Sequence, residues 1–214
     1  MITMSLKPAV VLLTSSNCPH CTSLKKQLDD VNNQGRLSSF EVINVEEQPE
    51  VAKHYNVRSV PWFKLGSYEF DEGMTAGQLN DWLDSLEIND GNGRYLEYLL
   101  LNGKLNQAIN WLENSNSLLE DVLELIVKPD VKINVRIGVG AVMEHFEGSA
   151  LIRQIQPQIV EMLHNENPAI RADACHFLSL TNDQSVLGHL QVMLNDNDEH
   201  VREIAQEVLD DLNH

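Results

Sequence analysis

The chain has 214 residues, which is enough for one compact domain and a second of modest size. Its 43% apolar and 22% charged residues are ordinary for a globular protein and exclude collagen-like, disulfide-stapled and broadly disordered chains. A net charge of −17 repels phosphate backbones and anionic lipids, so we expect neither nucleic acid nor a membrane as a partner.

Residues 1–88 predict alternating strands and helices. An apolar run at residues 9–13 predicts a strand buried on both faces. Further strands are expected at 40–45, 62–65 and 68–70, with helices after Cys18, at 49–55 and after Thr75. The order βαβαββα predicts a small mixed sheet between helices. The expected core contains Val10, Leu12, Val42, Val45, Phe63, Leu79 and Leu83.

The segment 89–93 consists of turn-forming residues without an apolar side chain, so we place a domain boundary there. Beyond it, leucine-rich amphipathic segments follow one another and no strand pattern of any length remains. We therefore expect an α/β domain over residues 1–88 and an all-helical domain over residues 94–214.

The helical half contains a repeat. An acidic turn, a Val/Ile-Arg pair and a helix pattern occur at Arg171 and again at Arg202, with every matched position displaced by 31 residues. A weaker third copy includes Arg136, and we expect the three arginines to pair with Asp or Glu between repeats. The period indicates a solenoid of stacked helical pairs. It resembles the short form of the HEAT repeat, most clearly over residues 134–214, which implies a surface for protein–protein interaction.

Two cysteines stand where the first strand ends and a helix begins. At that place Cys18 faces solvent, and free backbone N–H groups with the helix dipole favour its thiolate. Cys21 lies on the same side and is more buried, so it is placed to resolve a mixed disulfide. Pro19 suits the first helical turn, and His20 either stabilises the thiolate or is an ordinary surface residue.

The Cys18-Pro19-His20-Cys21 motif and a Val60-Pro61-Trp62 segment about 40 residues later resemble the thioredoxin superfamily over residues 6–88. The resemblance implies a thioredoxin-like α/β fold and a cis Val60–Pro61 bond beside the cysteines, where the backbone binds an extended substrate. A Pro-His pair between the cysteines looks like the oxidising branch of that superfamily.

The chain departs from thioredoxin at three positions. Leu12 replaces the buried aspartate that accepts the proton of the second cysteine, and Asn17 replaces the tryptophan before the first cysteine. Trp62 replaces the usual threonine after the proline. The loss at Leu12 leaves His20, His54 or water to take the proton from Cys21.

Several simpler interpretations stay open. Cys18 and Cys21 are alternatively inert core residues, or half of a zinc site completed by Cys175 and a histidine. Pro61 is alternatively an ordinary trans proline, and Trp62 a packing residue. Cys175 aligns with Gln206 in the next repeat, so we expect it to be partly exposed and consider it as a third redox cysteine.

The favoured hypothesis is a thiol–disulfide oxidoreductase that needs no cofactor or metal and acts on protein thiols and disulfides. Cys18 and Cys21 would be catalytic, and Pro19, His20, Val60, Pro61 and Trp62 would contact substrate. The helical repeats would dock protein partners, and their 19 acidic and 8 basic residues favour a basic protein.

The alternative is a non-catalytic adaptor, in which only the HEAT-like solenoid acts, by binding a partner. Because residues 9–13 are too short for the apolar part of a signal peptide, we expect a cytoplasmic protein.

Overall fold

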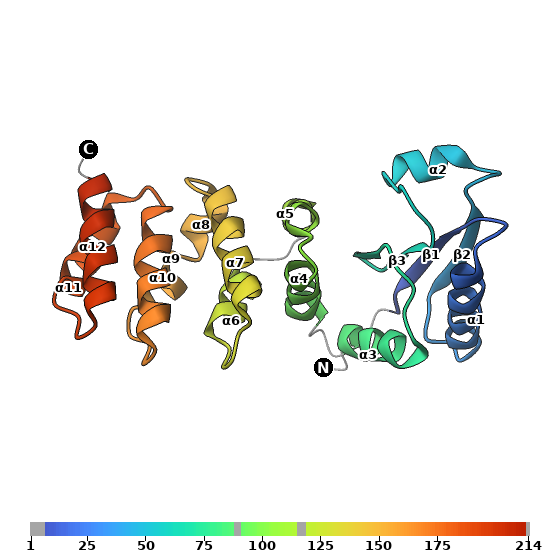
Figure 1. Ribbon diagram of the computed structural model, residues 1–214, viewed down its shortest axis with the longest axis horizontal. Helices are drawn as coiled ribbons and strands as arrows, with labels where there is room; N and C mark the ends of the chain where they lie inside the picture. Colours follow the sequence, from blue (N-terminus) through green and yellow to red (C-terminus); the bar gives the residue numbers. More distant parts are fainter. Residues whose placement is uncertain (1–6, 88–90, 115–118, 213–214) are drawn as a thin grey trace. The chain divides into compact units, whose positions relative to one another are not determined.

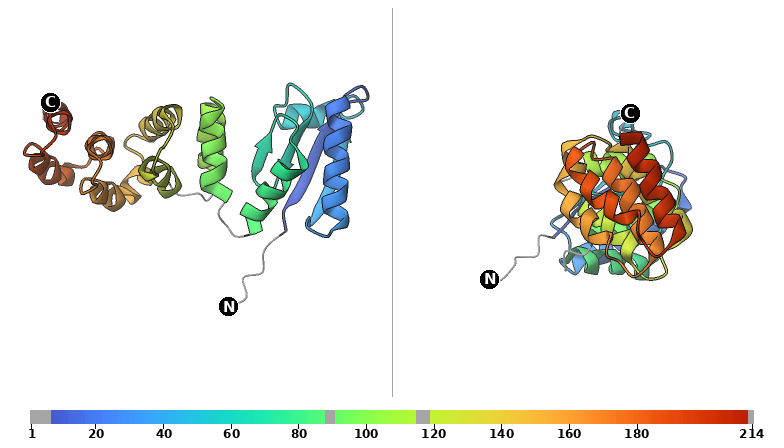
Figure 2. Two further views of the ribbon diagram at one scale, coloured as in Figure 1. Left: turned by 60° about the horizontal axis from the view of Figure 1, so that its bottom comes forward. Right: turned by 90° about the vertical axis from the view of Figure 1, so that its left-hand side faces the viewer.

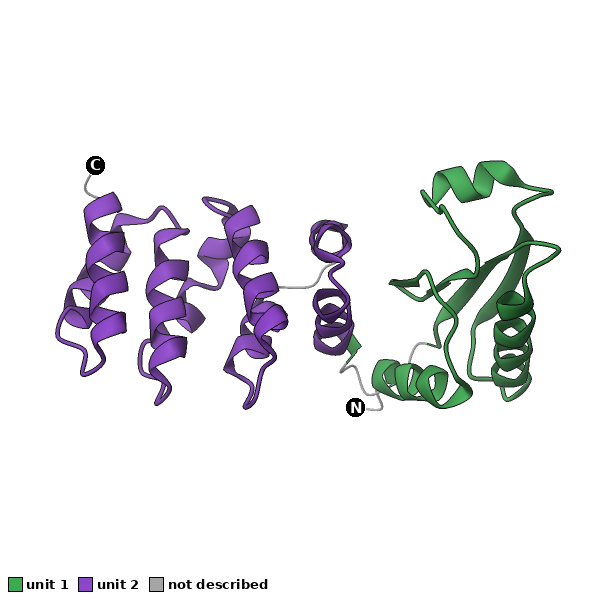
Figure 3. Ribbon diagram, in the orientation of Figure 1, with its two compact units in different colours: residues 1–91 green, residues 92–214 purple. Residues whose placement is uncertain are grey.

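The computed structural model describes residues 7–87, 91–114 and 119–212. The chain divides into two compact units, Met1–Gly91 and Asn92–His214 (Figure 3). We call them the N-terminal unit and the helical unit. The domain limits expected from the sequence, 1–88 and 94–214, concern independently folding domains and stay a prediction.

The N-terminal unit has the predicted order βαβαββα. Its elements are β1 (Ala9–Thr14), α1 (Pro19–Asn33), β2 (Ser39–Asn44), α2 (Pro49–His54), β3 (Trp62–Leu65), β4 (Tyr68–Phe70) and α3 (Ala76–Glu87). The sheet order is β2-β1-β3-β4, with β1 parallel to β2 and antiparallel to β3, and with β3 and β4 forming the predicted hairpin. The expected mixed sheet is therefore confirmed.

Helices cover both faces of this sheet. On one face, Leu13, Ile43 and Trp62 form a buried cluster against which Val51 and Tyr55 of the α2 region pack. The other face carries Leu12 and Val10, because side chains alternate along a strand. In the left view of Figure 2, α1 and α3 lie on one side of the sheet and α2 lies on the other.

Val42 corrects the predicted core. The other six expected core residues are buried or partly buried, but Val42 is 37% exposed. Its strand, β2, is the edge of the sheet, so one flank of Val42 has no neighbouring strand. The sequence pattern predicted the strand that contains Val42, whereas the burial of its residues depended on the order of the strands in the sheet.

The described part of the helical unit contains helices and no strand. They are α4 (Gly91–Leu101), α5 (Leu105–Asn114), α6 (Glu120–Val127), α7 (Ile133–His145), α8 (Ala150–Gln154), α9 (Gln156–Met162), α10 (Pro168–Ser179), a 3-10 helix (Gln184–Val186), α11 (Leu187–Met193) and α12 (Glu199–Leu212). Residues 91–93 of the boundary segment are helical and not turns, although the division between the two units falls inside that segment, after Gly91; residues 88–90 lie outside the described residues. Turn-forming composition was misleading because a helix tolerates such residues in its first turn.

The 31-residue repeat is visible in the structure. Helices α9 and α10 correspond to α11 and α12 at that offset. The buried positions repeat as Ile159 with Leu190, Met162 with Met193, Ile170 with Val201, Ala174 with Ala205, and Leu178 with Leu209. The fold class, an α/β thioredoxin-like unit followed by a HEAT-like helical region, is confirmed.

Each acidic turn repeats its hydrogen bonds as well. The Asn167 N–H donates to the Asn165 side chain at 2.9 Å, and the Asp198 N–H donates to the Asp196 side chain at 2.8 Å. Arg171 donates to the Asn165 carbonyl at 2.9 Å, while Arg202 donates to the Asp196 carbonyl at 2.7 Å. The arginine after each turn therefore ties the turn to the start of the helix.

Two of the three arginines also reach the next repeat, as predicted. Arg171 makes a two-point pair with Asp196, at 2.8 and 2.7 Å, and Arg136 pairs with Asp173. The hydrogen bond from Arg171 lowers the pKa of Asp196, whereas burial raises the pKa of Asp173 despite Arg136. Arg202 is in the last described repeat, and its described bonds stay within its own turn.

Helices α7, α10 and α12 lie side by side in one layer of the helical unit, and α6, α9 and α11 form the other (Figures 1 and 2). A hydrophobic core runs between the layers, and it includes Val139, Ile159 and Leu190. Within the described residues, every helix is too short or too polar to cross a membrane.

Candidate active site

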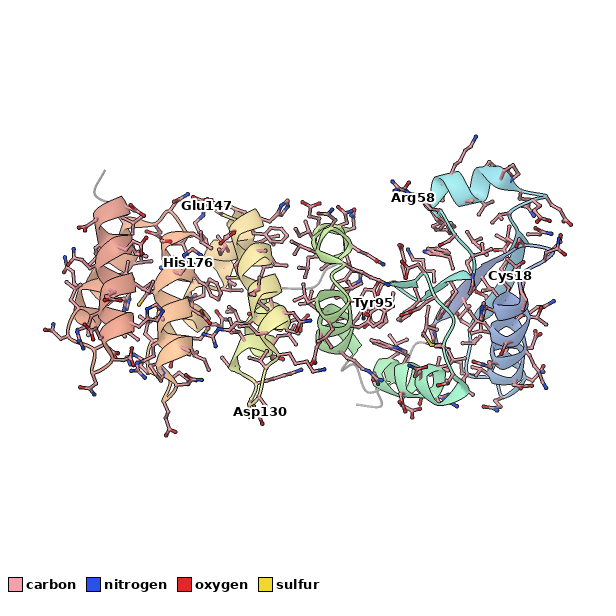
Figure 4. The ribbon with its side chains drawn as sticks, in the orientation of Figure 1. Cys18, Arg58, Tyr95, Asp130, Glu147 and His176 are labelled. Atoms are coloured by element: carbon pink, nitrogen blue, oxygen red, sulfur yellow. A yellow bond between two sulfur atoms is a disulfide. The ribbon has the colours of Figure 1, made fainter. Side chains whose placement is uncertain are left out.

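The cysteine pair lies at the start of α1. Cys18 occupies the N-cap with an extended backbone, φ −107° and ψ 100°, and Pro19 takes the first helical turn. The structure contains a Cys18–Cys21 disulfide at this position, which Figure 4 marks with the Cys18 label. Residues three apart at a helix start lie on the same side of the helix, so the two cysteines can form a disulfide without movement of the rest of the fold.

The two sulfurs differ in exposure. Cys18 is half-buried, whereas Cys21 is 3% exposed and shares the buried face of α1 with Leu24. The Cys21 N–H donates to Cys18 Sγ at 3.1 Å. A backbone N–H at a helix start stabilises negative charge on the atom that it faces, so the arrangement favours a thiolate at Cys18 after reduction.

The Val60–Pro61 peptide bond is cis, which confirms the prediction for that bond. Pro61 is buried, and its ring lines a cleft of ≈ 460 Å³ together with His20. The other walls of this cleft are Ser23, Leu24, Glu72, Gly73, Met74, Thr75 and Gln78. The fold thus brings His20 and Pro61, which are 41 residues apart, to one hollow beside the cysteine motif.

Trp62 has a different environment. Its side chain is 5% exposed and packs with Leu13 and Ile43 on the α2 face of the sheet. Its ring centre lies 4.8 Å from that of Tyr55. The packing interpretation of Trp62 therefore fits the structure, and little of the indole is available to a substrate. Val60 packs against the same cluster.

Leu12 is fully buried on β1, opposite Phe63 of β3. An apolar side chain thus occupies the buried position at which the thioredoxin resemblance implies a proton-accepting aspartate. His54 is exposed at the end of α2, with its ring centre 4.8 Å from that of Tyr55. His20 is exposed on α1 and lines the cleft.

The segment 72–74 was missed by the sequence reasoning. Its residues Glu72, Gly73 and Met74 complete the cleft, and a Cβ atom on Gly73 would lie 4.0 Å from the Pro61 ring. Thr75 then begins α3 as predicted, because its hydroxyl accepts the Gln78 N–H at 3.3 Å while Gln78 accepts the Thr75 N–H at 2.8 Å. The sequence did contain one indication of this cleft wall, a short loop between the predicted strand at 68–70 and the helix start at Thr75.

Cys175 corrects an expectation. It is fully buried in α10, and burial raises the pKa of its thiol to about 12. Gln206, its counterpart in the next repeat, is exposed because α12 is the last described helix of the stack and Gln206 lines an open hollow on it. Alignment to the last described repeat was therefore a poor guide to burial in the repeat before it.

Comparisons with known proteins agree with the two-part organisation. The family model described as thioredoxin matches residues 1–85, and the model described as HEAT repeats matches residues 119–210. A thioredoxin of Methanocaldococcus jannaschii is 36% identical over 66 residues, which cover 30% of this chain and 78% of that relative. Both predicted resemblances are thereby confirmed. Through its N-terminal unit, the chain belongs to the thioredoxin family.

Proposed function

We propose that the protein is a thiol–disulfide oxidoreductase that acts on protein substrates through Cys18 and Cys21. The observation that carries the proposal is the Cys18–Cys21 disulfide at the start of α1, within a unit of the thioredoxin family. Membership of the family supports redox work, and the difference in exposure between the two sulfurs supports separate roles for them.

In the reducing direction, the Cys18 thiolate attacks one sulfur of a substrate disulfide. A bond forms between Cys18 and that sulfur, the substrate S–S bond breaks, and the other substrate sulfur leaves as a thiolate. Cys21 then loses its proton and attacks Cys18 Sγ, which releases the second substrate thiolate and leaves the Cys18–Cys21 disulfide. Two electrons pass from the dithiol to the substrate, and the reverse sequence oxidises a substrate dithiol.

The cleft beside the motif suits the substrate chain. His20 and Pro61 line it, Pro19 forms the adjoining first turn of α1, and we propose Val60 and Trp62 as backbone contacts because their side chains pack elsewhere. With Leu12 in the place of a buried carboxylate, the proton from Cys21 passes to water or to an exposed histidine.

The test is catalysed reduction of insulin by dithiothreitol. We expect the full chain to accelerate the reaction, Cys18→Ser to abolish the acceleration, and Cys21→Ser to accumulate a mixed disulfide at Cys18 that mass mapping identifies. Cys175→Ala is the matched control and should keep wild-type turnover. Turnover that persists in Cys18→Ser would disprove the proposed chemistry.

For the helical unit we propose docking of basic protein partners, which is supported by its excess of acidic residues and by the match to HEAT repeats. Ile133 and Ile137 of α7 are 70% and 66% exposed and lie on one helix face, which continues to the exposed Glu144. We expect a partner segment that combines apolar side chains with lysine or arginine.

The docking role is tested with scrambled ribonuclease, a basic disulfide protein, and with bis(2-hydroxyethyl) disulfide as a small substrate. Ile133→Ser/Ile137→Ser should lower kcat/KM for the protein about threefold to tenfold, because apolar contact area is lost, and should leave the small substrate unchanged. Val192→Ser changes a residue of α11 that is 68% exposed, and it should behave as wild type. Equal turnover of ribonuclease by wild type and both variants would disprove the docking role of this surface.

One observation favours the adaptor: Leu12 fills the place of the usual proton acceptor. Partner binding through the helical unit without any thiol-dependent turnover would identify that function. For the oxidoreductase we propose a cytoplasmic location, where a reducing environment keeps Cys18 and Cys21 mainly as the dithiol.

A further inference from the structure

Two loops begin side by side at one end of the parallel strand pair. Thr14 is the last residue of β1 and Asn44 the last of β2, and the two are register partners. The loop after Thr14 runs directly into Cys18, whereas the loop after Asn44 leads to α2. The parallel pairing therefore places the chain that follows β2 next to the loop that leads to Cys18.

Side-chain hydrogen bonds join these loops. Both the N–H and the hydroxyl of Ser16 donate to Glu46 Oε2, the former at 3.4 Å. The Asn44 amide donates to the Ser16 hydroxyl at 3.2 Å, and the Glu46 N–H donates to Asn44 Oδ1 at 3.0 Å. Each of the three residues thus bonds to the other two, and we call this ring of bonds the loop latch.

We propose that Glu46 is a positioning residue for Cys18 and acts through Ser16. The proposal rests on the thiol–disulfide function proposed above and adds a residue to that site. Ser16 is two residues before Cys18, so a fixed Ser16 limits how far the cysteine backbone can move. Ser16 and Glu46 are exposed, and within the ring the charge-assisted bonds to the Glu46 carboxylate are the stronger ones.

The position of Cys18 matters because its thiolate depends on the start of α1. The Cys21 N–H faces Cys18 Sγ at 3.1 Å, and such a contact weakens steeply when distance or angle departs from the favourable range. When the latch is broken, Cys18 samples positions farther from this donor. The thiolate then loses stabilisation, so the pKa of Cys18 rises and the pair becomes a stronger reductant.

A second mechanism makes the opposite forecast. If Glu46 acted only through its negative charge, its removal would stabilise the thiolate and lower the pKa of Cys18. Glu47 offers a matched control, because it is the next residue, equally charged and exposed, and it takes no part in the ring of bonds. Comparing the two glutamates separates positioning from charge.

The experiment uses the reduced full chain and the variants Ser16→Ala, Glu46→Ala, Glu46→Gln and Glu47→Ala. The pKa of Cys18 is taken from iodoacetamide rates against pH with mass mapping, and the reduction potential from equilibration with glutathione. We expect Ser16→Ala and Glu46→Ala each to slow labelling of Cys18 at pH 7 about threefold, with a more negative potential.

Combining Ser16→Ala with Glu46→Ala should add little to either single change, because both break the same ring. Glu46→Gln should return toward wild type since its amide oxygen still accepts from Ser16, and Glu47→Ala should match wild type. A change of stability alone would move thermal unfolding without moving the pKa of Cys18, and that result overturns the proposal.

Failure of this inference differs from failure of the proposed function. If the variants shift the pKa of Cys18 while wild type reduces no protein disulfide, the positioning role of the loop latch is supported and the oxidoreductase function is disproved. If wild type is active but Cys18 is labelled in Ser16→Ala at the wild-type rate, or faster in Glu46→Ala, the positioning role is disproved and the oxidoreductase function is supported.

Discussion

Cys18 stands half-exposed at the start of α1 in the N-terminal unit, whereas Cys175 is fully buried within α10 of the helical unit. Before a helix begins, backbone N–H groups are still free and face the first cysteine. Within α10 those groups bond inside the helix, and burial raises the pKa of the Cys175 thiol to about 12. The same residue type is thus suited to chemistry in one unit and to packing in the other.

Polar bonds also differ between the two units. In the helical unit, the bonds of the acidic turn occur twice with the same donors and acceptors, 31 residues apart. In the N-terminal unit, Ser16, Asn44 and Glu46 form one ring beside Cys18. The repeated bonds stabilise a stack of similar helices, whereas the single ring is proposed to position Cys18. Substitutions of these residues should therefore lower stability in the helical unit and alter the chemistry of Cys18 in the N-terminal unit.

The largest effect should come from Cys18→Ser. Removing the attacking sulfur should lower turnover of a protein disulfide by on the order of a thousandfold or more. Cys175→Ala should leave turnover unchanged and reduce the free energy of unfolding by about 1 kcal/mol through a small cavity. Insulin reduction and urea unfolding measure the two quantities. A drop in turnover for Cys175→Ala would break the contrast between the cysteines.

The next effect concerns stability in the helical unit. Arg171→Met removes the two-point pair with Asp196 and the turn bonds, and should cost about 1–3 kcal/mol in unfolding free energy. Arg202→Met loses equivalent turn bonds without a described pair to a later repeat, so it should cost less. Chemical unfolding of both variants checks the order, and equal costs would show that the pair between repeats adds nothing.

This pair should also respond to acid. The pKa of Asp196 is lowered from an ordinary 3.8, so its stabilising contribution is present above that value and is lost as the pH falls through the lowered pKa. The stability difference between wild type and Arg171→Met should therefore shrink in strong acid. Urea midpoints at several pH values between neutral and strongly acidic measure it, and a constant difference would argue against an ionised pair.

In alkali the buried cysteine should act in the opposite direction. The pKa of Cys175 is raised from 9.0 to about 12, so its contribution is complete below pH 9 and is lost as the pH rises toward 12. Wild type should thus lose more stability over that interval than Cys175→Ala. Parallel loss in the two proteins would mean that the thiol ionises as easily in the folded state as in the unfolded one.

These contrasts show what the sequence could predict. The motif at Cys18 and Cys21, the cis bond at Pro61 and the capped start of α3 follow from local patterns or from a family resemblance, and they were found in advance. The 31-residue spacing identified equivalent helices because stacked repeats use the same buried positions. Local chemistry and periodicity are written in the order of the residues.

What was missed depends on neighbours that are remote in sequence. The exposure of Val42 depends on its place on the edge strand β2, on the face opposite the buried Ile43, and the burial of Cys175 follows from a further helical pair stacked on its own. Glu72 and Met74 reach the cleft only because the chain after β4 returns to Pro61. The ring at Ser16 likewise needs the parallel pairing of β1 with β2. Such contacts are set by tertiary arrangement, which no single window of sequence contains.

The smallest effect tests the edge position of β2. Val42→Thr should change the free energy of unfolding by no more than about 0.5 kcal/mol, because much of the side chain already meets water. Ile43→Val, at the neighbouring buried position, should cost about 0.5–1.5 kcal/mol. Urea unfolding ranks the two variants, and a reversed order would mean that the outer flank of β2 is covered in solution.

The most direct test of the central claim is a redox titration of the full chain in glutathione buffers, followed by mass mapping of the three cysteines. We predict one reversible two-electron transition that joins Cys18 to Cys21, while Cys175 stays an unmodified thiol at every poise. A transition that couples Cys175 to either of the others, or no reversible transition at all, would contradict the assignment of the redox chemistry to the N-terminal unit.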